Sequence, residues 1–169
     1  MKIKLSYILF VLLFSVAFQS CSNDNEQEKY AEWKQENEKF IEEIKNDPSS
    51  SYFQASIPQG PGIVYYKVIN KAQGDTGTYP LSTSQVKVRY KGSLINDYGV
   101  FDDASERITI MNVNGVVSGF SVALQNMKEG DKWEIYIPWD LGYGSSGKEP
   151  IPPYSALIFE LELVEISIH

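Results

Sequence analysis

The chain has 169 residues, of which 43% are hydrophobic and 22% are charged, and its formal net charge is −7. This length and composition suit one globular domain with short extensions, which can bury a core without disulfides. The acidic balance argues against nucleic acid as a partner, because nucleic-acid binding needs a basic face.

The sequence contains one cysteine and one histidine, His169, which is its last residue. A single cysteine cannot form an internal disulfide. One terminal imidazole cannot build a Ser–His or Cys–His nucleophile pair or a multi-histidine metal site. Any catalysis would therefore use carboxylates, tyrosines, backbone groups or apolar surface, and we expect no metal and no cofactor.

The first 21 residues have the pattern of an export signal. Lys2 and Lys4 form a basic start, and residues 8–18 are an apolar run too short for a comfortable transmembrane helix. The cysteine that follows, Cys21, resembles the lipidation site of bacterial lipoproteins. We expect residues 1–20 to be a signal peptide and Cys21 to be lipidated. The alternative is an ordinary signal peptide with an incidental cysteine.

Residues 21–29 are predicted to be the lipidated cysteine and a polar, acidic tether without core-forming side chains. Several acyl chains on Cys21 would give stable membrane attachment. We therefore expect an outer membrane lipoprotein of the cell envelope that faces the periplasm or the cell surface.

A helix is predicted from about residue 26 to residue 46, and Asp47-Pro48 ends it. One stripe of this helix carries the apolar side chains Tyr30, Trp33, Phe40, Ile41 and Ile44. The stripe could dock on the chain's own domain or form a dimer contact. One short helix favours docking, so we expect a monomer, with a dimer through residues 30–46 as the alternative. Residues 30–61 are thus predicted to be an amphipathic helix and a linker.

From residue 62 onward the hydrophobic period changes from helical to two. Five strands are predicted, at residues 63–69, 85–95, 107–113, 131–138 and 156–166. Clean alternation of apolar and charged residues predicts an antiparallel sheet with one wet face.

The apolar face of this sheet needs a cover, and one helical segment is available, at residues 118–128. Ser118 is placed to cap its start, and Gly130 is placed to end it. The predicted fold class is therefore α+β. A curved antiparallel β-sheet of about five strands wraps on one short α-helix, preceded by the N-terminal amphipathic helix.

Six short motifs follow one another along this domain. They are Val88-Arg89-Tyr90-Lys91-Gly92, Phe101-Asp102, Val116-Val117-Ser118-Gly119-Phe120, Met127-Lys128-Glu129-Gly130, Tyr143-Gly144, and Ile151-Pro152-Pro153 with Leu157 and Phe159. No single motif is specific, but their order is similar to that of the FKBP-type peptidyl-prolyl cis-trans isomerases. The resemblance covers about residues 62–166 and predicts an FKBP-type isomerase domain at residues 62–169.

The resemblance implies a pocket for proline-containing polypeptides. By position, its substrate-binding residues would be Tyr90, Phe101, Val116, Phe120, Ile151 and Phe159. The catalytic groups would be the Tyr143 hydroxyl and the Val117 N–H, which would hydrogen-bond substrate carbonyls, and Asp102 at the pocket edge. The implied function is prolyl isomerisation that assists the folding of exported proteins, and it needs no histidine or cysteine.

Several of these residues have a structural alternative. Tyr90, Val116 and Phe159 are as compatible with core packing as with a pocket. Asp102 could cap a turn, although its place directly after the motif phenylalanine favours a functional role. Tyr143 is hard to explain by packing, because a glycine flanks it on each side.

The departures from the family pattern include two that concern the pocket and the third strand. Phe120 stands where the pocket floor is usually tryptophan, and the third strand carries Ile108 and Ile110 where aromatic residues are usual. The altered third strand keeps an alternative open, a non-catalytic FKBP-fold lipoprotein of the cell envelope that binds a peptide or a partner. A third possibility is a surface protein that binds host or nutrient ligands.

Overall fold

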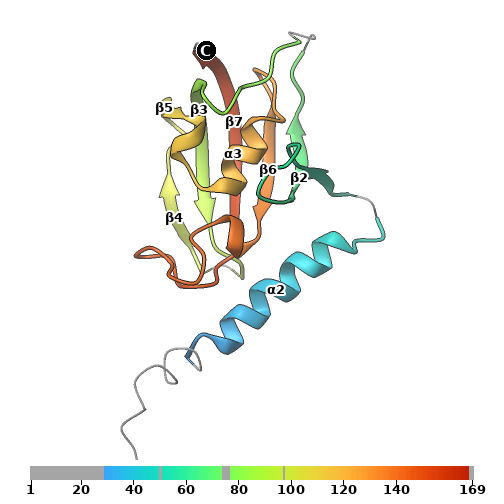
Figure 1. The fold of residues 1–169 in the computed structure, drawn as a ribbon, viewed down its shortest axis with the longest axis vertical. Helices are drawn as coiled ribbons and strands as arrows, with labels where there is room; N and C mark the ends of the chain where they lie inside the picture. The colour runs from blue at the N-terminus through green and yellow to red at the C-terminus, as the bar shows by residue number, and fades with distance from the viewer. Residues whose placement is uncertain (1–28, 50, 74–76, 97, 168–169) are drawn as a thin grey trace, which may run out of the picture. The chain divides into compact units, whose positions relative to one another are not determined.

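The computed structural model describes residues 29–49, 51–73, 77–96 and 98–167 (Figure 1). The expected signal peptide, Cys21 and the tether up to residue 28 lie outside these residues. In the described part of the chain, none of the helices combines the length and the apolar character that crossing a membrane requires.

Within the described residues, seven strands form one sheet, in which every pair is antiparallel (Figure 1). They are β1 (Phe53–Ala55), β2 (Val64–Asn70), β3 (Gln85–Ser93), β4 (Val100–Asp103), β5 (Thr109–Asn112), β6 (Lys132–Ile137) and β7 (Leu157–Ser167). The spatial order is β1-β2-β6-β7-β3-β4, and β5 also pairs with β3. The predicted α+β fold is confirmed, with two strands more than expected, the short β1 and β4.

One helix, α3 (Ser118–Leu124), lies against one face of the sheet (Figure 1). Its buried side chains, Phe120, Val122, Ala123 and Leu124, share a core with the inward residues of β3, β6 and β7. Fully burying a large apolar side chain stabilises the fold by roughly 1.5–3 kcal/mol. The core between helix and sheet is therefore the main source of stability.

Both ends of α3 differ from the prediction. Val117, not Ser118, occupies the N-cap position, and no side chain caps the helix. The helix ends at Leu124 because the backbone hydrogen bonds that follow are of the tighter 3-10 type. The N–H groups of Asn126 and Met127 donate to carbonyls three residues back, at 2.9 and 3.1 Å.

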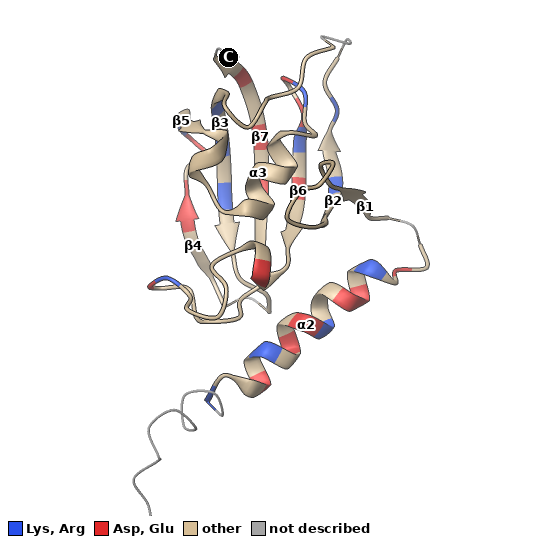
Figure 2. Cartoon of the chain, viewed as in Figure 1, with Lys and Arg blue, Asp and Glu red and all other residues tan. Residues whose placement is uncertain are grey.

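Charged residues recur along β3, β6 and β7 (Figure 2), and their side chains pair across the strands on the face opposite the helix-covered core. Three pairs link β3 or β6 to β7: Lys87–Glu165 at 2.8 Å, Arg89–Glu162 at 3.3 Å and Lys132–Glu160 at 3.0 Å. Exposed pairs of this kind each contribute only about 0–1 kcal/mol, so they mainly keep this face wet.

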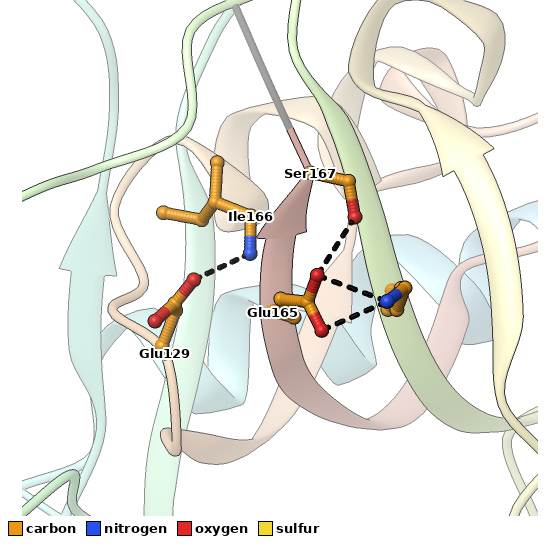
Figure 3. Close-up of polar contacts among 5 residues, drawn as sticks. Glu129, Glu165, Ile166 and Ser167 are labelled. Atoms are coloured by element: carbon orange, nitrogen blue, oxygen red, sulfur yellow. Dashed lines mark hydrogen bonds and ion pairs between the residues drawn. The ribbon is translucent and has the colours of Figure 1, made fainter.

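A carboxylate completes the sheet where β7 runs past the start of β6. The backbone N–H of Ile166 donates to Glu129 Oε1 at 2.6 Å (Figure 3). The Gly130 N–H donates to the Leu163 carbonyl at 2.7 Å. The turn before β6 therefore supplies the hydrogen bonds that a longer β6 would make.

The second helix, α2 (Ala31–Lys45), is the N-terminal amphipathic helix that the sequence predicts. From Glu32 onward the chain forms one compact unit, so this helix and the sheet belong together. Ile44 is buried in a cluster with Tyr65 and Tyr136, and Phe40 and Ile41 pack against that cluster. These tyrosines pair with one another across β2 and β6, on the face that points away from α3. The sheet thus covers the C-terminal part of the apolar stripe of α2, at Phe40, Ile41 and Ile44.

Candidate active site

A cavity of about 380 Å³ lies beside α3, where β3, β4, β5 and β7 meet two loops. One loop follows the 3-10 helix η1 (Val113–Gly115), and the other follows the 3-10 helix η2 (Trp139–Leu141). The cavity is lined by Tyr90, Phe101, Asp102, Met111, Gly115, Val116, Val117, Phe120, Tyr143, Lys148 and Phe159. Its size and its mixture of aromatic walls with a few polar groups are typical of a small-ligand site.

Aromatic rings form the floor and one wall of the cavity. Phe159 meets three rings at steep angles: Phe120 at 5.0 Å between centroids, Phe101 at 5.5 Å and Tyr90 at 6.3 Å. Edge-to-face pairs at such distances each contribute about 0.5–1.5 kcal/mol beyond their area burial. The rings therefore hold one another in a fixed arrangement around the cavity.

The glycine of the first motif has a packing reason. Gly92 lies opposite Phe159 in the β3–β7 ladder. A Cβ atom there would come within 2.6 Å of the rings of both Phe101 and Phe159. Only a residue without a side chain leaves these rings room to meet at the cavity wall.

One hydrogen bond joins two polar groups of the wall. The Tyr90 hydroxyl donates to Asp102 Oδ2 at 2.7 Å. Burial, helped by this bond and by the charge of the Asp102 carboxylate, raises the pKa of Tyr90 to about 12. The hydroxyl therefore keeps its proton near neutral pH.

Tyr143 reaches the cavity from the loop after η2. The backbone bonds of this loop include Gly144 N–H to the Trp139 carbonyl at 2.9 Å and Gly147 N–H to the Tyr143 carbonyl at 3.2 Å. Gly144 has a φ of +66°, a left-handed conformation that strongly favours glycine. Lys148 lies with its ammonium 5.3 Å from the centroid of the Tyr143 ring. These contacts thus hold Tyr143 at the cavity wall.

Two hydrogen-bond donors belong to residues that line the cavity. The Val117 N–H precedes the first turn of α3, and in the described part of the chain it donates to no other group. The Tyr143 hydroxyl likewise donates to no other group among the described residues. A bound carbonyl oxygen could accept from either donor.

The structure brings eight of the nine predicted pocket and catalytic residues into this one cavity. Ile151 is the exception, because it is buried in the core and does not line the cavity. Its backbone instead pairs with that of Lys148. Three lining residues were not predicted: Met111, Gly115 and Lys148. Strand alternation could have signalled Met111, but the two loop residues carry no such periodic signal.

A larger hollow of about 620 Å³ lies elsewhere, beside β2. Phe53, Tyr79 and Trp133 contribute to its lining, and it contains none of the predicted site residues. Among the described residues, no group of three or more His, Cys, Asp and Glu side chains is placed to hold a metal ion.

The sequence profile described as FKBP-type peptidyl-prolyl cis-trans isomerase matches residues 77–164, more than half of the chain. The match contains the motifs that build the cavity, and the fold around it is the FKBP fold. The chain therefore belongs to the FKBP-type peptidyl-prolyl cis-trans isomerase family.

Three relatives illustrate this membership. An Escherichia coli protein named FKBP-type 22 kDa peptidyl-prolyl cis-trans isomerase is 44% identical over 104 residues, which cover 60% of this chain and 48% of that protein. The Outer membrane protein MIP of Legionella longbeachae is 34% identical over 131 residues, covering 72% and 54%. A crystal structure of a peptidyl-prolyl cis-trans isomerase from Pseudomonas syringae pv. tomato matches with a TM-score of 0.69 and 28% identity, covering 82% and 96%. The chain spans about half the length of the curated relatives it matches.

Proposed function

We propose that this protein is a peptidyl-prolyl cis-trans isomerase and that the cavity beside α3 is its active site. The observation that carries the proposal is that two unused donors, the Val117 N–H and the Tyr143 hydroxyl, line one cavity with an aromatic floor. Family membership supports the same activity.

The reaction needs a site of this kind. Rotation about an X-Pro bond crosses a barrier of ~18–20 kcal/mol that amide resonance sets. In the twisted transition state that resonance is lost, so the carbonyl carries less negative charge. An apolar cavity shaped for the twisted amide would bind it better than the planar, well-solvated ground state.

Each group of the cavity has a role in this proposal. The ring cluster around Phe159 and Phe120 would hold the proline ring. The Val117 N–H and the Tyr143 hydroxyl would donate to substrate carbonyls on either side of it. Asp102, already bonded to Tyr90, would orient the edge of the pocket. No step moves a proton, so no general base is required.

The test is isomerisation of a proline-containing peptide by purified protein. We expect wild type to accelerate it, and a Tyr143→Phe/Phe101→Ala double variant to lose at least about tenfold in kcat/KM. A matched control changes the same residue types in the other hollow, as Tyr79→Phe/Phe53→Ala, and should keep the wild-type rate. Equal rates for wild type, the double variant and buffer would rule out the activity.

One observation favours a second candidate, a non-catalytic module that binds a peptide or a partner. Met111 is the one described residue of β5 that lines the cavity, and Ile108 and Ile110 do not line it, so this strand contributes no aromatic side chain to the site. Binding of a proline-containing peptide without any acceleration of its isomerisation would favour this alternative.

We further propose that the protein acts in the cell envelope, on exported clients that contain proline. The N-terminal pattern that ends at Cys21 supports a lipid anchor, and the name of the Legionella relative supports an outer membrane location. Incorporation of labelled palmitate into wild type but not into a Cys21→Ser variant tests the anchor. Protease treatment of whole cells then separates exposure at the surface from exposure to the periplasm.

A further inference from the structure

A buried asparagine stands in the middle of α2. Asn37 is 0% exposed, although its neighbours Glu36 and Glu38 are exposed. Asparagine is a poor helix former, and a buried amide is costly unless it is hydrogen-bonded. Packing alone would be served better by an apolar residue here, so the polar side chain calls for a polar reason.

Both polar atoms of the Asn37 amide group hydrogen-bond to the backbone. Its Nδ2 donates to the Trp33 carbonyl at 2.7 Å, one turn earlier in α2. Its Oδ1 accepts from the backbone N–H of Ala156 at 2.8 Å. Ala156 comes directly before β7, at the end of the loop that returns from the cavity. The asparagine therefore fixes the point where this loop enters the sheet.

A second contact between the same two segments lies next to the first. The Trp33 indole N–H donates to Ser155 Oγ at 3.0 Å, and the Ser155 hydroxyl donates to the Pro152 carbonyl at 2.8 Å. Two consecutive loop residues, Ser155 and Ala156, are thus held by side chains one helical turn apart.

The residue before this anchor is in a strained conformation. Tyr154 has a φ of +60°, which is uncommon for a residue with a side chain and persists where surrounding contacts hold it. In that conformation its N–H donates to the Gly144 carbonyl at 2.9 Å. Gly144 is the direct neighbour of Tyr143, so the anchors on α2 lie two hydrogen-bonded steps from the cavity.

We propose that Asn37 is a positioning residue for the active site. With Trp33, it holds the segment 152–156 in the form that keeps Tyr143 at the cavity. The far end of α2 has a different role, because Ile44 packs in the cluster with Tyr65 and Tyr136, which contains none of the residues 152–156. The positioning role of Asn37 rests on the proposed isomerase function, in which Tyr143 binds the substrate.

The test uses the full chain with Asn37→Leu, which keeps the size, favours the helix and removes the acceptor for Ala156. Without this acceptor the loop samples other forms, so substrate meets fewer binding-competent molecules. We expect KM to rise about three- to tenfold with kcat within about twofold of wild type. Hydrogen exchange at the Ala156 and Tyr154 amides should accelerate at least about tenfold, with no change at the β3 amides.

Two further variants keep the test sharp. Trp33→Phe keeps an aromatic ring but removes the indole N–H that Ser155 accepts, and should shift KM and exchange in the same direction by a smaller factor. Ile44→Ala destabilises the same helix away from the loop, and should leave KM and Ala156 exchange near wild type. An unchanged Ala156 exchange in Asn37→Leu, or an equal KM increase in Ile44→Ala, would overturn the positioning role. If wild type has no isomerase activity, the proposed function fails, and exchange at Ala156 and Tyr154 still decides whether Asn37 holds the loop.

Discussion

The Tyr90 hydroxyl donates to Asp102 Oδ2 at 2.7 Å and so ties β3 to β4 at the cavity wall. Burial, together with this contact, raises the pKa of Tyr90 to about 12 in the folded protein. An unfolded tyrosine titrates near pH 10. The stability that burial and this contact give to the neutral Tyr90 is therefore fully present below pH 10 and is lost as the pH rises from 10 through 12.

We expect Tyr90→Phe to be destabilised by about 0.5–1 kcal/mol at pH 8, because the pair is partly exposed and solvent weakens it. Above pH 10 the difference from wild type should shrink. Urea unfolding at pH 8, 10 and 11 measures this. Burial also raises the pKa of Tyr66, which has no bond to Asp102. Tyr66→Phe is therefore the control for burial, and the larger loss expected for Tyr90→Phe at pH 8 reports the bond. A difference between Tyr90→Phe and wild type that stays constant with pH would contradict the assignment.

The close approach of two rings at Gly92 predicts a packing defect. Gly92→Ala places a Cβ atom within 2.6 Å of Phe101 and Phe159. The rings must move, which we expect to cost about 1–3 kcal/mol of unfolding free energy and to lower kcat/KM. Gly115→Ala is the matched control in the same cavity, because its nearest contact would be 3.7 Å. Denaturant unfolding of the two variants should separate them; equal stability would show that the wall adapts.

The unused hydroxyl of Tyr143 predicts a loss of activity without a loss of stability. Tyr143→Phe removes one hydrogen bond to substrate, worth about 0.5–1.5 kcal/mol, or roughly two- to tenfold in kcat/KM. The unfolding free energy should change by less than about 0.5 kcal/mol. Tyr79→Phe makes the same change outside the cavity and should leave kcat/KM unaltered. A Tyr143→Phe enzyme with wild-type kcat/KM would remove this hydroxyl from the mechanism.

Elements with a clear period could be predicted from the sequence, and the four-residue β5 lies inside the predicted strand at residues 107–113. Two other short strands could not be predicted. The alternation along residues 157–163 identifies β7, and the apolar stripe from Trp33 to Ile44 identifies α2. By contrast, β1 has three residues and β4 has four, too few for a period to emerge. Their pairing with neighbours, not their composition, makes them strands.

The candidate site followed the same division. Residues on strands or on α3, such as Phe120 and Phe159, were assigned to the cavity because a motif and a face agree. Ile151 and Lys148 lie three residues apart in one loop, and the turn between them decides which side chain reaches the cavity. The burial of Asn37 could not be predicted from the sequence, since a polar residue among the polar residues of a helix is expected to be exposed.

Two carboxylates near the end of β7 should differ in how much stability their removal costs and in how that cost responds to salt (Figure 3). Glu129 accepts from the backbone N–H of Ile166, so Glu129→Ala leaves a donor without its partner and should cost about 1–2 kcal/mol. Glu165 pairs with Lys87 at the surface, so Glu165→Ala should cost about 0–1 kcal/mol.

Urea unfolding at low salt and at 1 M salt compares the two alanine variants. Salt should erase the Glu165→Ala effect and leave most of the Glu129→Ala effect, because screening acts on exposed charges and not on a lost backbone partner. Glu129→Gln keeps an oxygen acceptor and should recover part of the stability. Equal losses for the two alanine variants, or a Glu129→Ala effect that vanishes in salt, would mean that the backbone bond does not secure β7.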